Sequence, residues 1–219
     1  MHYDQYCYLW PPRPERAQGA NLLHTYERQR WWAQAKMNGQ CLVLAISPER
    51  EIIARGRHGD EAPKLWCPGE NLQRLADQLP GRGWHVLVCE LLHTKGVGVK
   101  DTVYLHDILV DDGDYLIGVP MRDRQRRLHK LVHWPFALHA GPNSDPGDWS
   151  HTEFPYLPGI WLTINHHKHF RALYDQRPGP YVEGLVLKDP DAPLALCSKA
   201  GRNSEWQAKC RYPNNMLSF

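Results

Sequence analysis

Short apolar runs of strand length recur along most of the chain and are separated by turn residues. They cover residues 40–46, 51–55, 84–92, 102–109, 183–188 and 206–212. Residues 47–50, Ser-Pro-Glu-Arg, are typical of a turn, so the first two runs predict a β-hairpin. Asp111-Asp112-Gly113 predicts another turn after the run at 102–109.

Other stretches have the periodicity of helices. Leu72, Leu75 and Leu79 have the spacing of an apolar helix face, and Pro80-Gly81 ends this predicted helix. Further helices are predicted over 21–32, 121–134 and 166–176, and the Gly-, Pro-, Asp- and Ser-rich stretch 140–160 predicts a loop. Strands that are mixed irregularly with helices, without an internal repeat, indicate an α+β fold.

The helix predicted over 121–134 is basic. Leu128, Leu131 and Val132 form its apolar stripe, and the charged residues are assigned to the opposite face. Two interpretations of that face stay open, contact with a nucleic-acid backbone and an ordinary solvated surface. The arginines concerned are Arg122, Arg124, Arg126 and Arg127.

Length and composition limit the class of protein. A chain of 219 residues suits one domain with elaborations, and we expect a Pro/Arg-rich arm over 1–20 and a single domain over 21–219. The 42% hydrophobic and 23% charged residues argue against a disordered chain, a collagen or a coiled coil. The sequence contains no membrane-length apolar stretch and no signal peptide, so we expect an intracellular, cytoplasmic protein without a membrane partner. Its six cysteines form no Cys-x-x-Cys pair and are interpreted as reduced thiols.

Six short segments carry candidate chemistry. A phosphoryl-type transfer through a covalent intermediate needs a nucleophile, cations that gather phosphates, and carboxylates for a divalent metal. Glu183 and Lys188 lie within an otherwise apolar run, where charged residues are seldom tolerated unless they are paired or functional. The segments, in chain order, are Lys36-Met37-Asn38-Gly39, Arg57-His58-Gly59, Cys89-Glu90-Leu91, His106-Asp107-Ile108-Leu109, the run 183–188 (EGLVLK), and Lys209-Cys210-Arg211.

This series resembles the covalent nucleotidyltransferase superfamily, which comprises ATP-dependent DNA ligases, RNA ligases and mRNA capping guanylyltransferases. The resemblance spans residues 31–212 and is closest to DNA-ligase adenylation domains, through the segment 105–120 (LHDILVDDGDYLIGVP). It implies an α+β nucleotidyltransferase domain of antiparallel β-sheets flanked by helices. Ligases generally continue into an OB-fold, and the few residues after Tyr212 leave no room for one, so no OB-fold is expected here.

The resemblance also implies a role for each segment. Lys36 is expected to attack the α-phosphate of ATP and form a covalent lysine–AMP intermediate, with Lys188 and Lys209 as further catalytic cations. Glu183 and Glu90 are expected to hold Mg²⁺ or Mn²⁺. The residues expected to bind the nucleotide are Gly39, Arg57, Glu90, His106, Glu183, Lys188, Lys209 and Arg211.

The function implied is an ATP-dependent polynucleotide ligase that seals nicks between a 5′-phosphate and a 3′-hydroxyl, with DNA as the favoured substrate. Arg57 is expected to contact the ribose or the nucleic-acid 5′-phosphate. Without an OB-fold, the N-terminal arm and the basic helix would supply more of the nucleic-acid contact, and a clamp partner protein is the alternative. A phage or viral source is compatible with so compact a ligase.

Four departures from the family keep other functions open. Asn38 replaces the usual Asp of the first motif, Cys41 replaces an Arg, His106 replaces an aromatic residue, and Arg211 replaces a Lys. Asn38 favours an RNA ligase with the same chemistry as the first alternative. A GTP-using capping-type guanylyltransferase and a degenerate nucleotide-binding module are the others.

Overall fold

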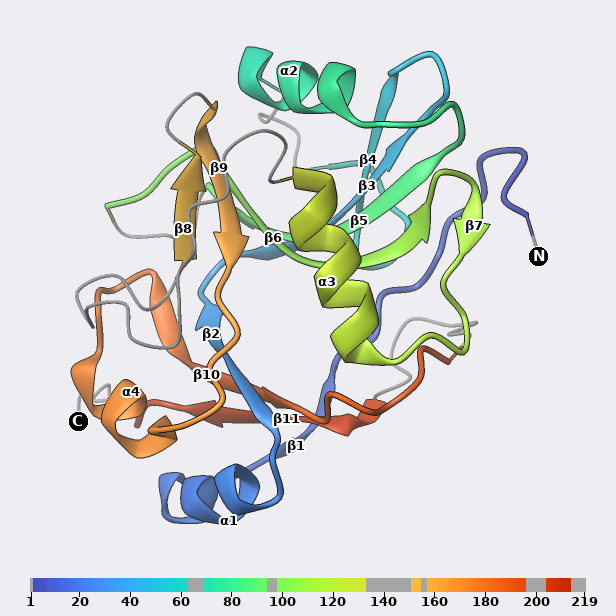
Figure 1. Ribbon diagram of the computed structural model, residues 1–219. Helices are drawn as coiled ribbons and strands as arrows, with labels where there is room; N and C mark the ends of the chain where they lie inside the picture. The colour runs from blue at the N-terminus through green and yellow to red at the C-terminus, as the bar shows by residue number, and fades with distance from the viewer. Residues whose placement is uncertain are drawn as a thin grey trace.

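Two β-sheets form the framework of the molecule, one in the upper and one in the lower half of Figure 1. The computed structural model describes residues 2–62, 69–93, 98–132, 151–154, 157–195 and 204–213. The smaller sheet has four strands, in the order β1 (Pro14–Ala17), β11 (Ser204–Arg211), β10 (Val182–Lys188) and β2 (Trp32–Met37). Strand β10 is antiparallel to both of its neighbours, whereas β1 runs parallel to β11.

The larger sheet has seven strands. Its order is β4 (Ile52–Gly56), β3 (Gln40–Ile46), β5 (His85–Leu92), β6 (Thr102–Asp111), β9 (Leu157–Thr163) and β8 (His151–Phe154), and β7 (Asp114–Tyr115) pairs with β6. The pairing is antiparallel except between β6 and β9. Because β2 and β3 belong to different sheets, the chain passes from one sheet to the other at Asn38-Gly39.

The helices cover two separate hydrophobic cores. They are η1 (Ala20–Leu22), α1 (Leu23–Arg28), α2 (Glu70–Gln78), α3 (Met121–Val132) and α4 (Phe170–Gln176). Apolar residues of α2 and α3 pack in the core of the larger sheet, and those of α1 and α4 pack in the core of the smaller sheet. No helix in the described part of the chain is long and apolar enough to cross a membrane.

The α+β class with mainly antiparallel sheets is confirmed, as are the predicted strands and the helix near 71–79. The loop predicted over 140–160 is wrong where β8 and β9 occupy 151–154 and 157–160, and its remaining residues lie outside the described part of the chain. Pro158 and Gly159 gave that stretch the composition of a loop. Strand β9 depends on a partner distant in sequence, since its residues from Ile160 to Leu162 pair with β6.

The predicted arm over 1–20 is packed against both sheets. Tyr3 is buried in the core of the larger sheet, and its hydroxyl donates a 2.5 Å hydrogen bond to the carbonyl of Cys7. Further along, Pro14–Ala17 form β1 of the smaller sheet. The N-terminal segment therefore bridges the two sheets.

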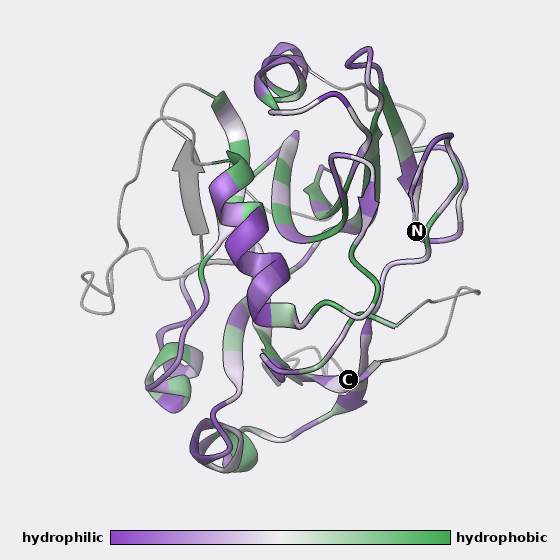
Figure 2. Cartoon of the chain, turned by 45° about the vertical axis from the view of Figure 1, so that its right-hand side comes forward, coloured by the Kyte–Doolittle hydropathy of each residue, from purple (hydrophilic) through white to green (hydrophobic). Residues whose placement is uncertain are grey.

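Arg124 is buried, so its assignment to the exposed face of the basic helix is wrong. In Figure 2 most of α3 is coloured hydrophilic, yet the Arg124 side chain is 0% exposed. Its Nε and Nη2 atoms each donate a 3.0 Å hydrogen bond to the Asp107 carboxylate on β6, and Nη1 donates a 2.8 Å bond to the carbonyl of Val119. This guanidinium fixes α3 to the sheet and cannot reach a nucleic acid at the surface.

Candidate active site

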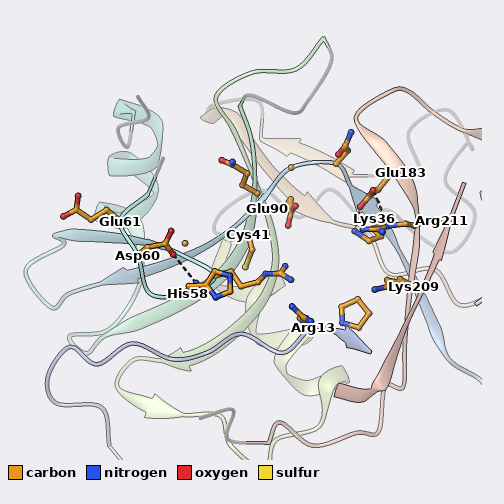
Figure 3. A pocket seen from close by; sticks show the side chains of 16 residues that line it. Arg13, Lys36, Cys41, His58, Asp60, Glu61, Glu90, Glu183, Lys209 and Arg211 are labelled. Carbon is orange, nitrogen blue, oxygen red and sulfur yellow. Dashed lines mark hydrogen bonds and ion pairs between the residues drawn. The ribbon is translucent and has the colours of Figure 1, made fainter. Parts of the chain in front are cut away.

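A cavity of about 720 Å³ lies between the two sheets, and a narrower recess of about 80 Å³ adjoins it. Figure 3 shows that labelled side chains from both sheets, among them Lys36, Glu90, Lys209 and Arg211, face the cavity, whereas Glu61 points away from it. All eight of the predicted nucleotide-binding residues line one or both hollows together with the candidate nucleophile. Residues lining both are Arg13, Pro14, Lys36, Cys41, Arg57 and Glu90.

Lys36 lies at the junction of the cavity and the recess. Its Nζ donates a short hydrogen bond to Oε1 of Glu183 on the neighbouring strand β10. The second carboxylate oxygen of Glu183 lies 3.4 Å from Nε of Arg211. The carboxylate therefore holds the Lys36 amine at a fixed place and itself has a second cationic partner.

Gly184, next to Glu183, permits this arrangement. Its φ is +143°, and a Cβ there would lie 2.0 Å from the carbonyl oxygen of Cys210 on β11. The register between β10 and β2 also shifts between Val182 and Gly184. The Glu-Gly pair of the predicted motif thus combines a cavity-lining carboxylate with a backbone position that only glycine fits.

Glu90 and Gly39 lie on the side of the cavity formed by the larger sheet. Burial raises the pKa of Glu90 to about 6, while the charges of Lys36 and Arg57 and a backbone hydrogen bond from Gly39 oppose that rise. Glu90 is therefore mainly a carboxylate at neutral pH. A Cβ at Gly39 would lie 2.5 Å from the carbonyl oxygen of Leu91, so this turn also needs a glycine.

We predict that Gly39→Ala destabilises the fold by about 1–3 kcal/mol, because the rigid backbone of β5 cannot move away from the added methyl group. Gly69→Ala is the control without a steric clash, since a Cβ there meets nothing within 4 Å. Because Gly69 is the N-cap of α2, where alanine is less favourable than glycine, this change should cost less than about 1 kcal/mol. Urea denaturation of both variants tests this. Equal unfolding midpoints for both would contradict the close approach at Gly39.

The recess contains His106 and Lys188. Burial and the Lys188 charge lower the pKa of His106 to about 3, so its imidazole is neutral at physiological pH. Burial lowers the pKa of Lys188 to about 8, an effect that the Asp107 carboxylate opposes. The neutral ring of His106 can stack on a flat heterocycle. The cation of Lys188, a residue that is buried at 3% exposure, can pair with an anionic group of the same ligand.

The rim of the cavity is cationic. Lys209 and Arg211 lie on β11, and Arg57 follows β4. Burial lowers the pKa of Lys209, and the positive charges of Arg211 and Lys36 lower it further. Such clustered cations are stabilised by bound phosphates.

Cys41 is the residue that departs from the arginine of the motif that this segment resembles. It is a free thiol that hydrogen-bonds the Arg57 side chain, and burial raises its pKa to about 11. At neutral pH it is an uncharged neighbour of Arg57, so Arg57 supplies the positive charge on this side of the cavity.

The other arginines of the basic helix lie outside the cavity lining and have acidic partners. Arg122 pairs with Asp191, Arg126 with Asp123 at 2.6 Å, and Arg127 with Asp111 at 3.4 Å. Their side chains are 41%, 74% and 46% exposed, so contact with a nucleic-acid backbone stays a prediction for these residues.

Sequence reasoning missed Arg13 and Gln34 as lining residues. Arg13 lines both hollows, and Gln34 lines the recess. The Pro-Arg-Pro sequence at 12–14 is a signal for a rigidly presented arginine, and Gln34 lies two residues before the candidate nucleophile.

The donor set fits a hard divalent cation. Glu90 and Glu183 both line the cavity, and no cluster of three or more metal-ligating side chains occurs in the described part of the chain. Mg²⁺ is commonly held by one or two carboxylates, with waters and substrate phosphates as its other ligands. Two glutamates beside a cationic rim suit that pattern.

No protein-family model and no curated protein sequence matches the chain, whereas solved structures do. The ligase domain of LigD from M. tuberculosis is 16% identical, with a TM-score of 0.62 over 93% of this chain and 59% of that chain. The ATP-dependent DNA ligase from bacteriophage T7 in complex with ATP is 14% identical, with a TM-score of 0.51 over 91% and 68%. A structure of Lig E DNA ligases, described as DNA binding with a minimal scaffold, is 13% identical, with a TM-score of 0.50 over 92% and 69%.

These likenesses concern the fold. The chain has the fold of ATP-dependent DNA ligase domains, which confirms at this level the resemblance found in the sequence motifs. It spans 59% of the LigD ligase domain that it matches.

Proposed function

We propose that the chain is an ATP-dependent polynucleotide ligase that acts through a covalent lysine–AMP intermediate. The observation that carries the proposal is the position of Lys36, whose amine is held by Glu183 where a recess suited to a base meets a cavity with a cationic rim. The DNA-ligase fold supports the same conclusion. A nucleotide with its base in the recess would have its α-phosphate beside Lys36.

The first step transfers AMP to Lys36. The Lys36 ammonium gives up a proton, for which the paired Glu183 carboxylate is the nearest acceptor. The freed electron pair on Nζ then forms a bond to the α-phosphorus while the bond from phosphorus to the bridging oxygen breaks, and pyrophosphate leaves with that electron pair. Lys209 and Arg211 would neutralise charge on the phosphates during this exchange.

Two further transfers would complete ligation. A 5′-phosphate oxygen of the nucleic acid attacks the α-phosphorus of the adduct, and the P–N bond breaks to release Lys36. A 3′-hydroxyl then loses its proton and attacks the activated 5′-phosphate, which forms the phosphodiester and expels AMP. Arg57 is the candidate for holding the 5′-phosphate, because its guanidinium suits bidentate phosphate contact.

Glu90 and Glu183 would hold Mg²⁺ or Mn²⁺. The ion would neutralise negative charge on the phosphates when bound. The protein's own contribution is to keep Glu90 mainly ionised at neutral pH and to orient Glu183 between Lys36 and Arg211.

Gln34 supports ATP rather than GTP as the nucleotide. Gln125 donates a 2.8 Å hydrogen bond to the carbonyl of His106, which fixes the orientation of its amide and directs its oxygen toward Gln34. Nε2 of Gln34 donates to Gln125 at 3.2 Å and to Asn165 at 2.7 Å, so both of its N–H groups are used. The remaining amide oxygen can accept from the amino group of adenine, whereas guanine offers an acceptor at that position.

Intact mass spectrometry tests the proposal. Incubation with Mg²⁺ and ATP should add the mass of one AMP, and GTP should add nothing. Nicked DNA should then be sealed in preference to nicked or single-stranded RNA. An adduct from GTP alone would replace the proposal by a capping-type reaction, and sealing of RNA alone would replace DNA as the substrate. No adduct with either nucleotide, also with Mn²⁺ and after removal of pyrophosphate, would overturn it.

A further inference from the structure

The N-terminal segment crosses from the larger sheet to the smaller one along the edge of the cavity. The Tyr8 hydroxyl donates a 2.8 Å hydrogen bond to the carbonyl of Gly56, directly before Arg57. Beyond residue 13 the chain pairs with β11, and the Gln18 amide donates a 2.9 Å bond to the carbonyl of Lys209. The dark blue segment follows this path to β1 in Figure 1. The crossing segment is therefore tied to the backbone of Gly56, next to Arg57, on the larger sheet and to the backbone of Lys209 on the smaller one.

Arg13 projects from this crossing into the site. It lines both the cavity and the recess, as do Lys36 and Arg57, so it lies at the junction where the two hollows meet. Figure 3 shows its side chain directed into the cavity on the side of Lys209. Arg13 also contributes to the lowered pKa of Lys209, which agrees with this proximity.

The prolines on either side make the presentation of Arg13 rigid. Pro12 and Pro14 each have a φ that is restricted by their ring, and Pro14 already belongs to β1. The backbone of Arg13 therefore has little freedom to lose when the side chain binds an anion. A preorganised guanidinium can hold two oxygens of one phosphate.

We propose that Arg13 is a catalytic residue that binds the α-phosphate of the nucleotide during transfer to Lys36. This rests on the proposed function, because the junction is where the α-phosphate would meet the Lys36 amine. As the N–P bond forms and the P–O bond to pyrophosphate breaks, Arg13 remains a cation and exchanges no proton. It would hold the non-bridging oxygens in place and stabilise the negative charge of the transition state.

The test compares Arg13→Gln and Arg13→Lys with a control on the same segment. Arg16→Gln is that control, since Arg16 lies on β1 but lines a separate hollow beside Tyr26 and Trp31. In single turnovers with the full chain, Arg13→Gln should slow formation of the ATP-derived adduct by about 100-fold, a typical effect of removing one preorganised donor. Arg13→Lys should retain part of the rate, and Arg16→Gln should stay within about twofold of wild type.

Two measurements separate a chemical role of Arg13 from a structural one. Millimolar guanidinium added to Arg13→Gln should restore part of its rate and should leave Arg16→Gln unchanged. Calorimetric titration with ATP should show weaker binding by Arg13→Gln, and the unfolding temperatures of both variants should match wild type.

The outcomes distinguish this inference from the proposed function. If wild type forms the adduct and Arg13→Gln equals it in rate and ATP affinity, the inference is overturned and the proposed function stands. If wild type forms no adduct but binds ATP at least tenfold more tightly than Arg13→Gln, the proposed function fails and the phosphate contact stands. If wild type neither reacts with ATP nor binds it, both are wrong.

Discussion

Lys36→Ala is expected to abolish the ATP-derived adduct, with a loss of at least about 10⁴-fold in the rate of its formation. The variant lacks Nζ of Lys36, which is the protein atom that would form the bond to the α-phosphorus. Lys188 and Lys209 cannot replace it, because Lys188 is buried within the recess and Lys209 is held on β11 across the cavity. Lys36→Arg should fail equally, since its guanidinium stays protonated and is a poor nucleophile. Intact mass spectrometry after incubation with ATP and Mg²⁺ measures both.

A later step of the reaction shows whether Lys36→Ala has lost only its nucleophile or also its folded active site. Lys36→Ala should still seal a nick that already carries AMP on its 5′-phosphate, because the attack of the 3′-hydroxyl needs no lysine nucleophile. Lys168→Ala, at an exposed lysine just before α4, should form the adduct as wild type does. An AMP adduct on Lys36→Ala at the wild-type level would assign the nucleophile to another residue.

Local patterns predicted those parts of the fold in which neighbours in sequence are also neighbours in space. The hairpin of β3 and β4 and the apolar face of α2 are examples, because turn residues and periodicity determine them. The proximity of Lys36 to Glu183 has no such local signal. It arises from the pairing of β2 with β10, and only the family motifs indicated that these two residues meet.

The arrangement of charged residues could not be predicted in the same way. Arg124 follows the buried spacing of α3, since Met121, Leu128 and Leu131 also face the sheet. Its charge nevertheless led to its assignment to the exposed face. The carboxylate that makes its burial tolerable belongs to Asp107 on β6, and nothing in the sequence of the helix indicates that partner. Arg13 was missed for a related reason, since a strand that pairs in parallel with β11 cannot be recognised from the residues around it.

Arg124→Met is expected to cause the largest loss of stability among single changes outside the cavity. The Arg124–Asp107 pair is fully desolvated, with exposed fractions of 0% and 2%. Removing one partner of such a pair leaves an uncompensated buried charge and costs about 3–5 kcal/mol. For a chain of this size that corresponds to a fall of about 10 °C in Tm. Urea denaturation at pH 7 measures the change, and Arg126→Met, at an exposed arginine on the same helix, should stay within about 0.5 kcal/mol of wild type.

The pH dependence identifies the buried pair as the cause. Burial alone would raise the pKa of Asp107, but the Arg124 charge and its hydrogen bonds outweigh burial and lower it. A carboxyl group with a lowered pKa in the folded state contributes stability above its unfolded pKa of about 3.9, and that contribution is lost as the pH falls through the folded pKa. Without Arg124, burial raises the pKa of Asp107 above its unfolded value. The difference between wild type and Arg124→Met should therefore be largest above that raised pKa. It should shrink as the pH falls from there toward the lowered pKa of Asp107 in wild type. Replacing both partners, as Asp107→Leu with Arg124→Met, should recover part of the lost stability at pH 7, because the unpaired carboxylate is removed. The recovery is partial because the buried Lys188 then loses the Asp107 carboxylate that favours its charged form. A double variant that is as unstable as the sum of the single variants would instead assign the loss to packing around α3.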